Sequence, residues 1–180
     1  PLEDAITIFV EKMLGQSTSP QVRQMIELPC NRGGLGIVNP VRQADQEFTN
    51  SCILTEKLKC EILSLPVSNE SNPEDAKKRI LRIIQQNKQT MYDNVYEDSD
   101  ENTRRTLELL QERGTSTWLT AQPSESDDFY FNKQEFRDAI AVRYDWKLQD
   151  MPTKCECGKP NNLDQALSCK LGGFVIMRHN

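Results

Sequence analysis

The chain has 180 residues, of which 37% are hydrophobic and 27% charged, and its formal net charge is −5. The wide polar share, with few glycines and aromatic residues, favours helices over a β-sandwich or barrel. The acidic balance argues against a free-standing nucleic-acid-binding domain, which needs an excess of lysine and arginine. Six cysteines occur without an apolar leader or a membrane-spanning run, so we expect reduced thiols in an intracellular protein.

Two helices are predicted before residue 29. Residues 2–14 place apolar side chains three and four positions apart, on one side of a helix. Ser19 followed by Pro20 is a helix-start signal, because serine caps free backbone N–H groups and proline fits the first turn. This second helix must end at Leu28–Pro29, since proline cannot continue it.

A glycine-rich segment and a long third helix come next. Residues 30–37 hold three glycines, which permit unusual backbone angles or the close approach of another chain or a ligand. The segment is no phosphate loop, because it lacks the GK[ST] ending and the GxGxxG spacing. Asn39–Pro40 starts a helix with an apolar stripe from Val41 to Leu65. We expect this helix to reach Pro66 and its stripe to form core against the first two helices.

The fourth predicted helix starts at Asn72–Pro73 and combines a thin apolar stripe with a basic polar side. Its cations are Lys77, Lys78, Arg79, Arg82 and Lys88. Such a pattern usually marks a solvated helix face, and a phosphate-contacting face is the sharper alternative.

Two shorter helices complete the predicted elements. Ser99 or Asp100 can cap a fifth helix, which we expect to end at Gly114. Asn132 with Glu135 has the spacing of a capping box, which predicts a helix from about Lys133 to Tyr144.

The densest chemistry is a group of zinc-type ligands in the last 26 residues. The candidates are Cys155, Cys157, Cys169 and His179. A structural zinc site takes four such ligands in a tetrahedron, and short Cys-x-Cys spacing lets one turn present two of them. The alternative is a small loop with free or buried cysteines. His179 is the one histidine in the sequence, and no complete set of catalytic residues is visible, so we expect no enzymatic activity.

Motifs at both ends of the chain resemble one protein family. The string LPCNRGGLGIVNP at residues 28–40, followed by Ala44–Asp45 and Ser51, resembles the segment after the polymerase palm in reverse transcriptases of retrotransposon-like elements. A second group of motifs is similar to the downstream part of those reading frames, where a Cys-Cys-His-Cys zinc knuckle precedes a restriction-like endonuclease, as in site-specific elements without long terminal repeats. These motifs are Trp118–Ala121, Glu135–Ala139, Arg143–Tyr144, Cys155–Gly158, Ala166–Cys169, Gly172–Phe174 and Arg178–Asn180.

The resemblance implies a mainly α fold in three parts. Residues 1–65 would be a thumb-like helical segment, 66–122 a helical connector with acidic loops, and 123–180 a helix plus a cysteine-rich knuckle leading into an endonuclease domain. The catalytic aspartates of a Tyr-x-Asp-Asp motif and the endonuclease carboxylates would lie outside this sequence. The implied function is non-catalytic binding of an RNA or DNA template or target, inside the cell and in the nucleus, with no membrane partner. Guesses for contacts to the nucleic-acid backbone are Arg23, Arg32, Lys57 and Lys59.

The sequence departs from the family pattern at one ligand. The family's histidine lies four residues before the last cysteine, and that position is Gln165 here. An amide is a poor zinc ligand, so either the site is lost or His179 takes the fourth place. Two other functions stay open: a helical protein-interaction module that uses the stripe from Val41 to Leu65, and a degenerate element copy without activity. The oligomeric state stays open as well.

Overall fold

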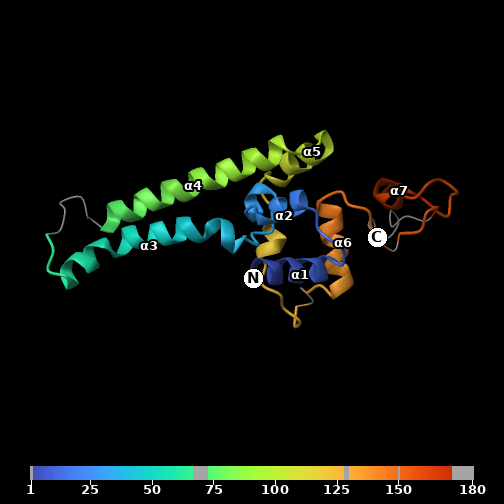
Figure 1. The fold of residues 1–180 in the computed structure, drawn as a ribbon. Helices are drawn as coiled ribbons and strands as arrows, with labels where there is room; N and C mark the ends of the chain where they lie inside the picture. The colour runs from blue at the N-terminus through green and yellow to red at the C-terminus, as the bar shows by residue number, and fades with distance from the viewer. Residues whose placement is uncertain (1, 67–72, 128–129, 150, 172–180) are drawn as a thin grey trace. The chain divides into compact units, whose positions relative to one another are not determined.

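The computed structural model describes residues 2–66, 73–127, 130–149 and 151–171 (Figure 1). Across these residues the chain is mainly α-helical, as predicted, with seven α-helices, two 3₁₀-helices and no strand. It divides into two compact units, Pro1–Gln122 and Pro123–Asn180. Every helix in the described ranges is too short or too polar to pass through a lipid bilayer.

The helices are distributed unevenly between the two units. The first unit holds α1 (Leu2–Leu14), α2 (Pro20–Glu27), η1 (Cys30–Arg32), α3 (Pro40–Ile62), α4 (Pro73–Glu97), α5 (Glu101–Leu110) and η2 (Thr117–Thr120). The second unit holds α6 (Lys133–Arg143) and α7 (Leu163–Ser168).

The predicted helix starts are confirmed where the structure describes the cap. The Ser19 hydroxyl accepts a hydrogen bond from the Val22 N–H at 3.2 Å, and the Asn39 side chain accepts from two N–H groups of α3. Asp100, one of the two predicted caps, begins α5. Asn132 and Glu135 form the complete capping box of α6. The predicted cap at Asn72 lies outside the described residues.

Two predicted helix ends are wrong. The third helix ends at Ile62 rather than near Pro66, because Ser64 has a φ of +53° and so cannot continue a right-handed helix. The fifth helix ends at Leu110 rather than Gly114. There the Thr115 hydroxyl donates to the Leu110 carbonyl at 2.9 Å and satisfies a backbone oxygen that the helix leaves free.

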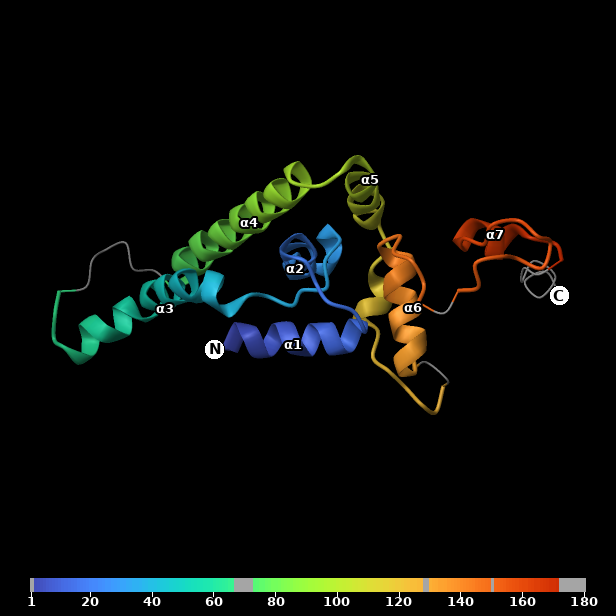
Figure 2. The same ribbon diagram turned by 45° about the vertical axis from the view of Figure 1, so that its right-hand side comes forward.

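The core of the first unit gathers around α2. Ile26, Leu28 and Leu107 are fully buried, and α2 packs on α4 while α5 packs on both α4 and η1. Figure 1 shows α3 and α4 next to one another as antiparallel helices, and Figure 2 shows that they separate toward the end of α4. The amide of Asn87 on α4 donates to the Gln46 side chain on α3 at 3.0 Å, which fixes the register of this pair.

The prediction that the α3 stripe forms core is wrong. Val41, Phe48 and Ile62 are each about 70% exposed, and Leu54, Leu58 and Leu65 are exposed as well. The helical period of the stripe is real, but α3 packs mainly along α4 and to a smaller extent against α1. One side of a 23-residue helix therefore carries apolar side chains that the described parts of the chain leave exposed.

The glycine-rich segment is explained by the fold itself. Gly34 passes so close to the Leu28 carbonyl that a Cβ atom there would overlap it. The Gly36 N–H donates to the same Leu28 carbonyl at 2.8 Å, and the Leu35 N–H donates to the Ile26 carbonyl at 3.1 Å. The close approach that the glycines permit is thus to the chain's own α2–η1 turn.

Candidate metal centre

The first half of the site is a tight backbone turn that presents two cysteines. The Cys155 N–H donates to the Lys159 carbonyl at 2.9 Å, and the Gly158 N–H donates to the Cys155 carbonyl at 2.8 Å. Gly158 has a φ of +83°, which a residue with a Cβ atom adopts only under strain. An antiparallel bridge between Lys154 and Pro160 closes the turn.

The second half is the short helix α7, which sequence reasoning missed. Its cap is the Asn162 side chain, which accepts from the Gln165 N–H at 2.7 Å. The helix ends where the Cys169 N–H donates to the Gln165 carbonyl at 2.9 Å, and Cys169 is buried there. An asparagine before Leu163 was the available signal, but a six-residue helix shows no apolar period.

The turn and the helix bring three sulfur atoms together. The Sγ atoms of Cys155, Cys157 and Cys169 all lie within 4.8 Å of one another. In a tetrahedral site with zinc–sulfur bonds of about 2.3 Å, sulfur atoms stand about 3.8 Å apart. Small side-chain adjustments would therefore let these three residues, the cysteine cluster, hold a metal ion.

The side chain of Gln165 lies against this cluster. Its Nε2 atom donates to the Cys157 Sγ at 3.2 Å. Gln165 is the position where the resemblance predicts a histidine ligand, and its side chain contacts one sulfur of the cluster. His179, the other candidate for that place, lies outside the described residues.

The pKa of the Cys157 thiol is raised above its usual value. A hydrogen bond from the Lys159 backbone lowers the pKa, but burial and the neighbouring Cys155 and Cys169 sulfurs together outweigh it. The neighbouring sulfurs raise the pKa because they hydrogen-bond to the neutral Cys157 thiol, and an ionised Cys155 would also repel the negative charge of a Cys157 thiolate. A bound cation would remove this repulsion, since metal ions coordinate thiolates.

The predicted nucleic-acid contacts fall into two groups. Arg23 is buried: its guanidinium donates to Glu3 at 2.9 Å and to the Ile37 carbonyl at 2.8 Å, and it lies 3.5 Å from Glu27. Arg42 completes the network at 3.3 Å from Glu27, whose side chain is only 1% exposed. A phosphate contact by Arg23 would require these bonds to break.

Arg32 is also held by the chain. Its guanidinium donates to the Gln111 side chain at 3.1 Å and lies 5.8 Å from the centre of the Tyr92 ring. Lys57 and Lys59, by comparison, are exposed on α3. Sequence reasoning missed the internal role of Arg23, although Glu27 four residues later was a visible signal for a helical ion pair.

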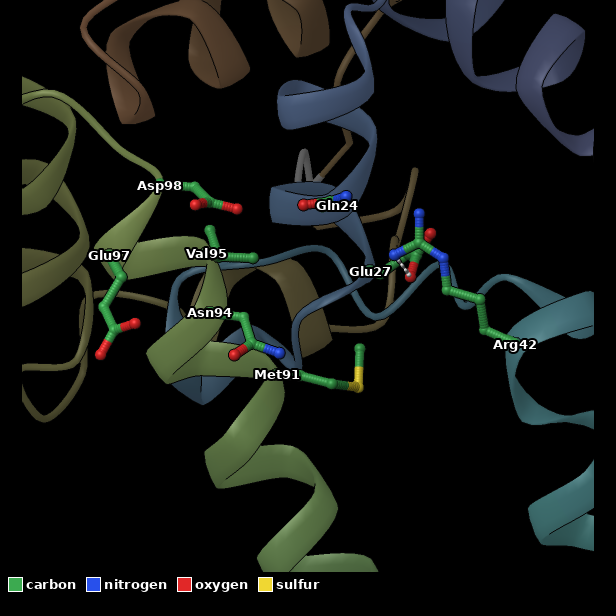
Figure 3. Close-up of a pocket in the computed structure, with 8 residues that line it drawn as sticks. All are labelled: Gln24, Glu27, Arg42, Met91, Asn94, Val95, Glu97 and Asp98. Carbon is green, nitrogen blue, oxygen red and sulfur yellow. Dashed lines mark hydrogen bonds and ion pairs between the residues drawn. The ribbon is translucent and has the colours of Figure 1, made fainter.

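A cavity of about 250 Å³ lies in the first unit (Figure 3). Figure 3 shows Glu27 and Arg42 paired at its wall, with side chains of α4 on the other side. Its lining residues are Gln24, Glu27, Arg42, Met91, Asn94, Val95, Glu97 and Asp98. Glu27, Glu97 and Asp98 outnumber the one guanidinium of Arg42 in this lining, so the cavity is electrostatically unsuited to phosphate.

Comparison with known proteins gives no match: no family model, no curated protein and no solved structure is similar to this chain.

Proposed function

We propose that this chain is a non-catalytic, nucleic-acid-binding region of a retroelement reverse transcriptase, and that its cysteine cluster is a structural zinc knuckle. The convergence of the Cys155, Cys157 and Cys169 sulfurs carries this proposal. The order of the motifs in the sequence supports the family assignment, from the segment 28–40 to the cysteines.

A structural metal would also stabilise the segment 151–171. Among residues 151–171, Cys169 is the one side chain that is buried, so this segment has almost no apolar core of its own. Small elements of this kind are held together by disulfides or metal ions. Zinc bound to the three thiolates would tie the turn at 155–158 to α7 and supply stability rather than catalysis.

We expect the fourth zinc ligand to lie beside the Gln165 side chain, which contacts the Cys157 sulfur. His179 would complete the site, because the amide of Gln165 is a poor zinc ligand. The exposed cations around the cluster are Lys154, Lys159 and Lys170, and the acidic residues are Glu156 and Asp164. The metal-loaded knuckle would thus present lysines in reach of a phosphate backbone.

A fluorescence anisotropy titration tests this function. The purified full chain is titrated into a labelled RNA–DNA primer–template duplex with zinc present. We expect binding that weakens roughly 100-fold between about 50 and 200 mM salt if about four phosphates are contacted. The same sample should neither extend the primer nor cut DNA. Absence of binding at low salt, or primer extension, would overturn the proposal.

A second candidate function is protein binding through α3. The exposed apolar side chains of Val41, Phe48, Leu58 and Ile62 favour it. Binding through such a surface would depend weakly on salt, because burial of apolar area and not ion release drives it. The salt dependence in the titration therefore separates the two functions.

A further inference from the structure

The first half of α4 carries a concentration of positive charge that the fold does not use. No acidic residue occurs between Asp75 and Asp93. The cations Lys77, Lys78, Arg82 and Lys88 lie on neighbouring positions of one side of the helix, and all four are exposed. We call these four residues the basic face; it extends about 16 Å along the helix axis at 1.5 Å per residue.

Ion pairs within the described parts of the protein neutralise little of the charge of the basic face. In the described parts of the chain, the ion pair that involves the basic face joins Lys78 to Asp75 at 3.8 Å, with both side chains about two-thirds exposed. Such an exposed pair contributes little. Lys78 and Arg82 are four residues apart, and like charges at this spacing destabilise a helix. The basic face therefore does not serve the stability of α4.

The opposite end of α4 and the loop after it are acidic. Five carboxylates occur there without a cation between them: Asp93, Glu97, Asp98, Asp100 and Glu101. A polyanion would be attracted to the first half of the helix and repelled from the second. The net charge of −5 thus hides a separation of charge along one helix.

The neighbouring helix adds to the positive end. Because Asn87 pairs with Gln46, the antiparallel register places the later half of α3 beside the earlier half of α4. That half of α3 carries the exposed Lys57 and Lys59. Figure 1 shows the same arrangement of the two helices.

The apolar side of α4 is already occupied. Ile80 and Val95 are buried in the first unit, whereas Leu81 is the exposed large apolar residue of this helix. A helix that lies on a lipid surface needs a free apolar side to enter the bilayer. α4 offers cations without such a side, which fits a polyphosphate chain better than a membrane.

We propose that the basic face of α4 binds the phosphate backbone of a nucleic acid strand. This inference rests on the proposed function and names the surface that performs it, in place of the internally bonded Arg23 and Arg32. Ammonium and guanidinium groups on one helix side contact phosphates without reading bases, so binding should show little sequence preference.

The test compares two variants of the full chain that lose the same number of charges. In the first, Lys77, Lys78, Arg82 and Lys88 are changed to glutamine, which preserves helix propensity. In the control, the exposed cations Arg105, Arg113, Lys133 and Lys147 are changed to glutamine. Circular dichroism verifies that both variants keep their helix content. The probes are a labelled RNA–DNA duplex and vesicles of phosphatidylcholine with phosphatidylserine.

We expect the basic-face variant to bind the duplex at least about tenfold more weakly, with a salt slope reduced by roughly one for each phosphate that is no longer bound. The control variant should bind like the unmodified chain. If the unmodified chain binds but the basic-face variant binds equally well, or both variants weaken equally, the inference is wrong and the proposed function stands. If the unmodified chain binds no duplex, or binds only vesicles, both are wrong.

Discussion

The glycine-rich turn and the cysteine turn are both unusual in the sequence, but they differ in the structure. The first makes its contacts within the fold, whereas the second brings together side chains that can bind a ligand. Residues 28–37 make their contacts with the chain itself. The missing side chain of Gly34 leaves room for the Leu28 carbonyl, and the Arg23 guanidinium donates to the Ile37 carbonyl. In residues 154–169 the backbone is equally well bonded, but three sulfur atoms converge beside the amide of Gln165.

The comparison shows how to separate residues that serve the fold from residues that serve a ligand. Arg23 has carboxylate and carbonyl partners from its own chain, so no ligand is needed to explain it. The three sulfur atoms of the cysteine cluster lie close enough together to hold a metal ion, in a segment that buries little else. Arg23 and the basic face of α4 differ in the same way, because Arg23 is bonded inside the protein and the basic face is exposed. Single substitutions can test both kinds of residue.

The largest expected effect is from Gly34→Ala. The new methyl group would overlap the backbone of Leu28, which cannot move aside as a side chain can. We expect a loss of about 4 kcal/mol or more in the free energy of unfolding, measured with chemical denaturant. Gly158→Ala is the matched control: its Cβ meets nothing within 4 Å, so strain at positive φ alone should cost about 1–2 kcal/mol locally. An equal loss of stability in the two variants would show that the close approach of Gly34 to Leu28 does not explain the glycine at position 34.

Arg23→Ala should come next. It would leave the buried carboxylate of Glu27 with a single arginine partner, and removal of one member of a buried ion pair costs about 3–5 kcal/mol. Lys59→Ala should change stability by less than about 0.5 kcal/mol. The folded fraction of the Arg23 variant should still bind the duplex with unchanged affinity. Weaker binding without loss of stability would show that Arg23 contacts nucleic acid.

Gln165→His tests whether the cysteine cluster can accept a fourth zinc ligand. Because the Gln165 side chain already reaches Cys157, an imidazole there should complete a three-cysteine, one-histidine zinc site. We expect zinc affinity to rise roughly tenfold or more, measured by competition with a chromophoric chelator. Gln165→Leu is the control and should not raise the affinity. Equal zinc affinity in both variants would place the fourth ligand elsewhere.

The smallest effect concerns pH and the buried Glu27. Burial raises its pKa above the ordinary value of 4.5, and this outweighs the lowering by Arg42 and Arg23. The folded state therefore holds the proton more tightly than the unfolded state. Its contribution to stability is present below about pH 4.5 and is lost as the pH rises through the raised pKa. Denaturation midpoints across this range should show the trend, and Glu27→Gln should remove it.

Much of the fold could be predicted because proline and capping residues mark helix starts. Pro20 and Pro40 begin helices in the structure, and Asn132 with Glu135 begins α6. The apolar stripe of α3 was misleading, because a helical period says which side is apolar and not whether anything covers it. The helix α7 was missed because it depends on one cap and on its place beside the cysteines.

The candidate site was only partly predictable. Cysteine spacing named the three thiols, and the structure brings them together. Spacing alone could not show that Gln165 reaches Cys157, because this depends on the α7 helix. A related limit applies to the arginines: a sequence shows their charge, but only the fold shows that Arg23 is already paired with Glu3.

The zinc content of the full chain tests whether the cysteine cluster holds a metal ion. The protein is purified under reducing conditions, equilibrated with zinc, separated from free metal and measured by mass spectrometry of the elements. We predict about one zinc ion per chain, lost in Cys155→Ser and kept in Cys52→Ser, a free cysteine of α3. A chain without bound zinc, or one whose zinc content is unchanged by Cys155→Ser, would show that the cysteine cluster is not a zinc site.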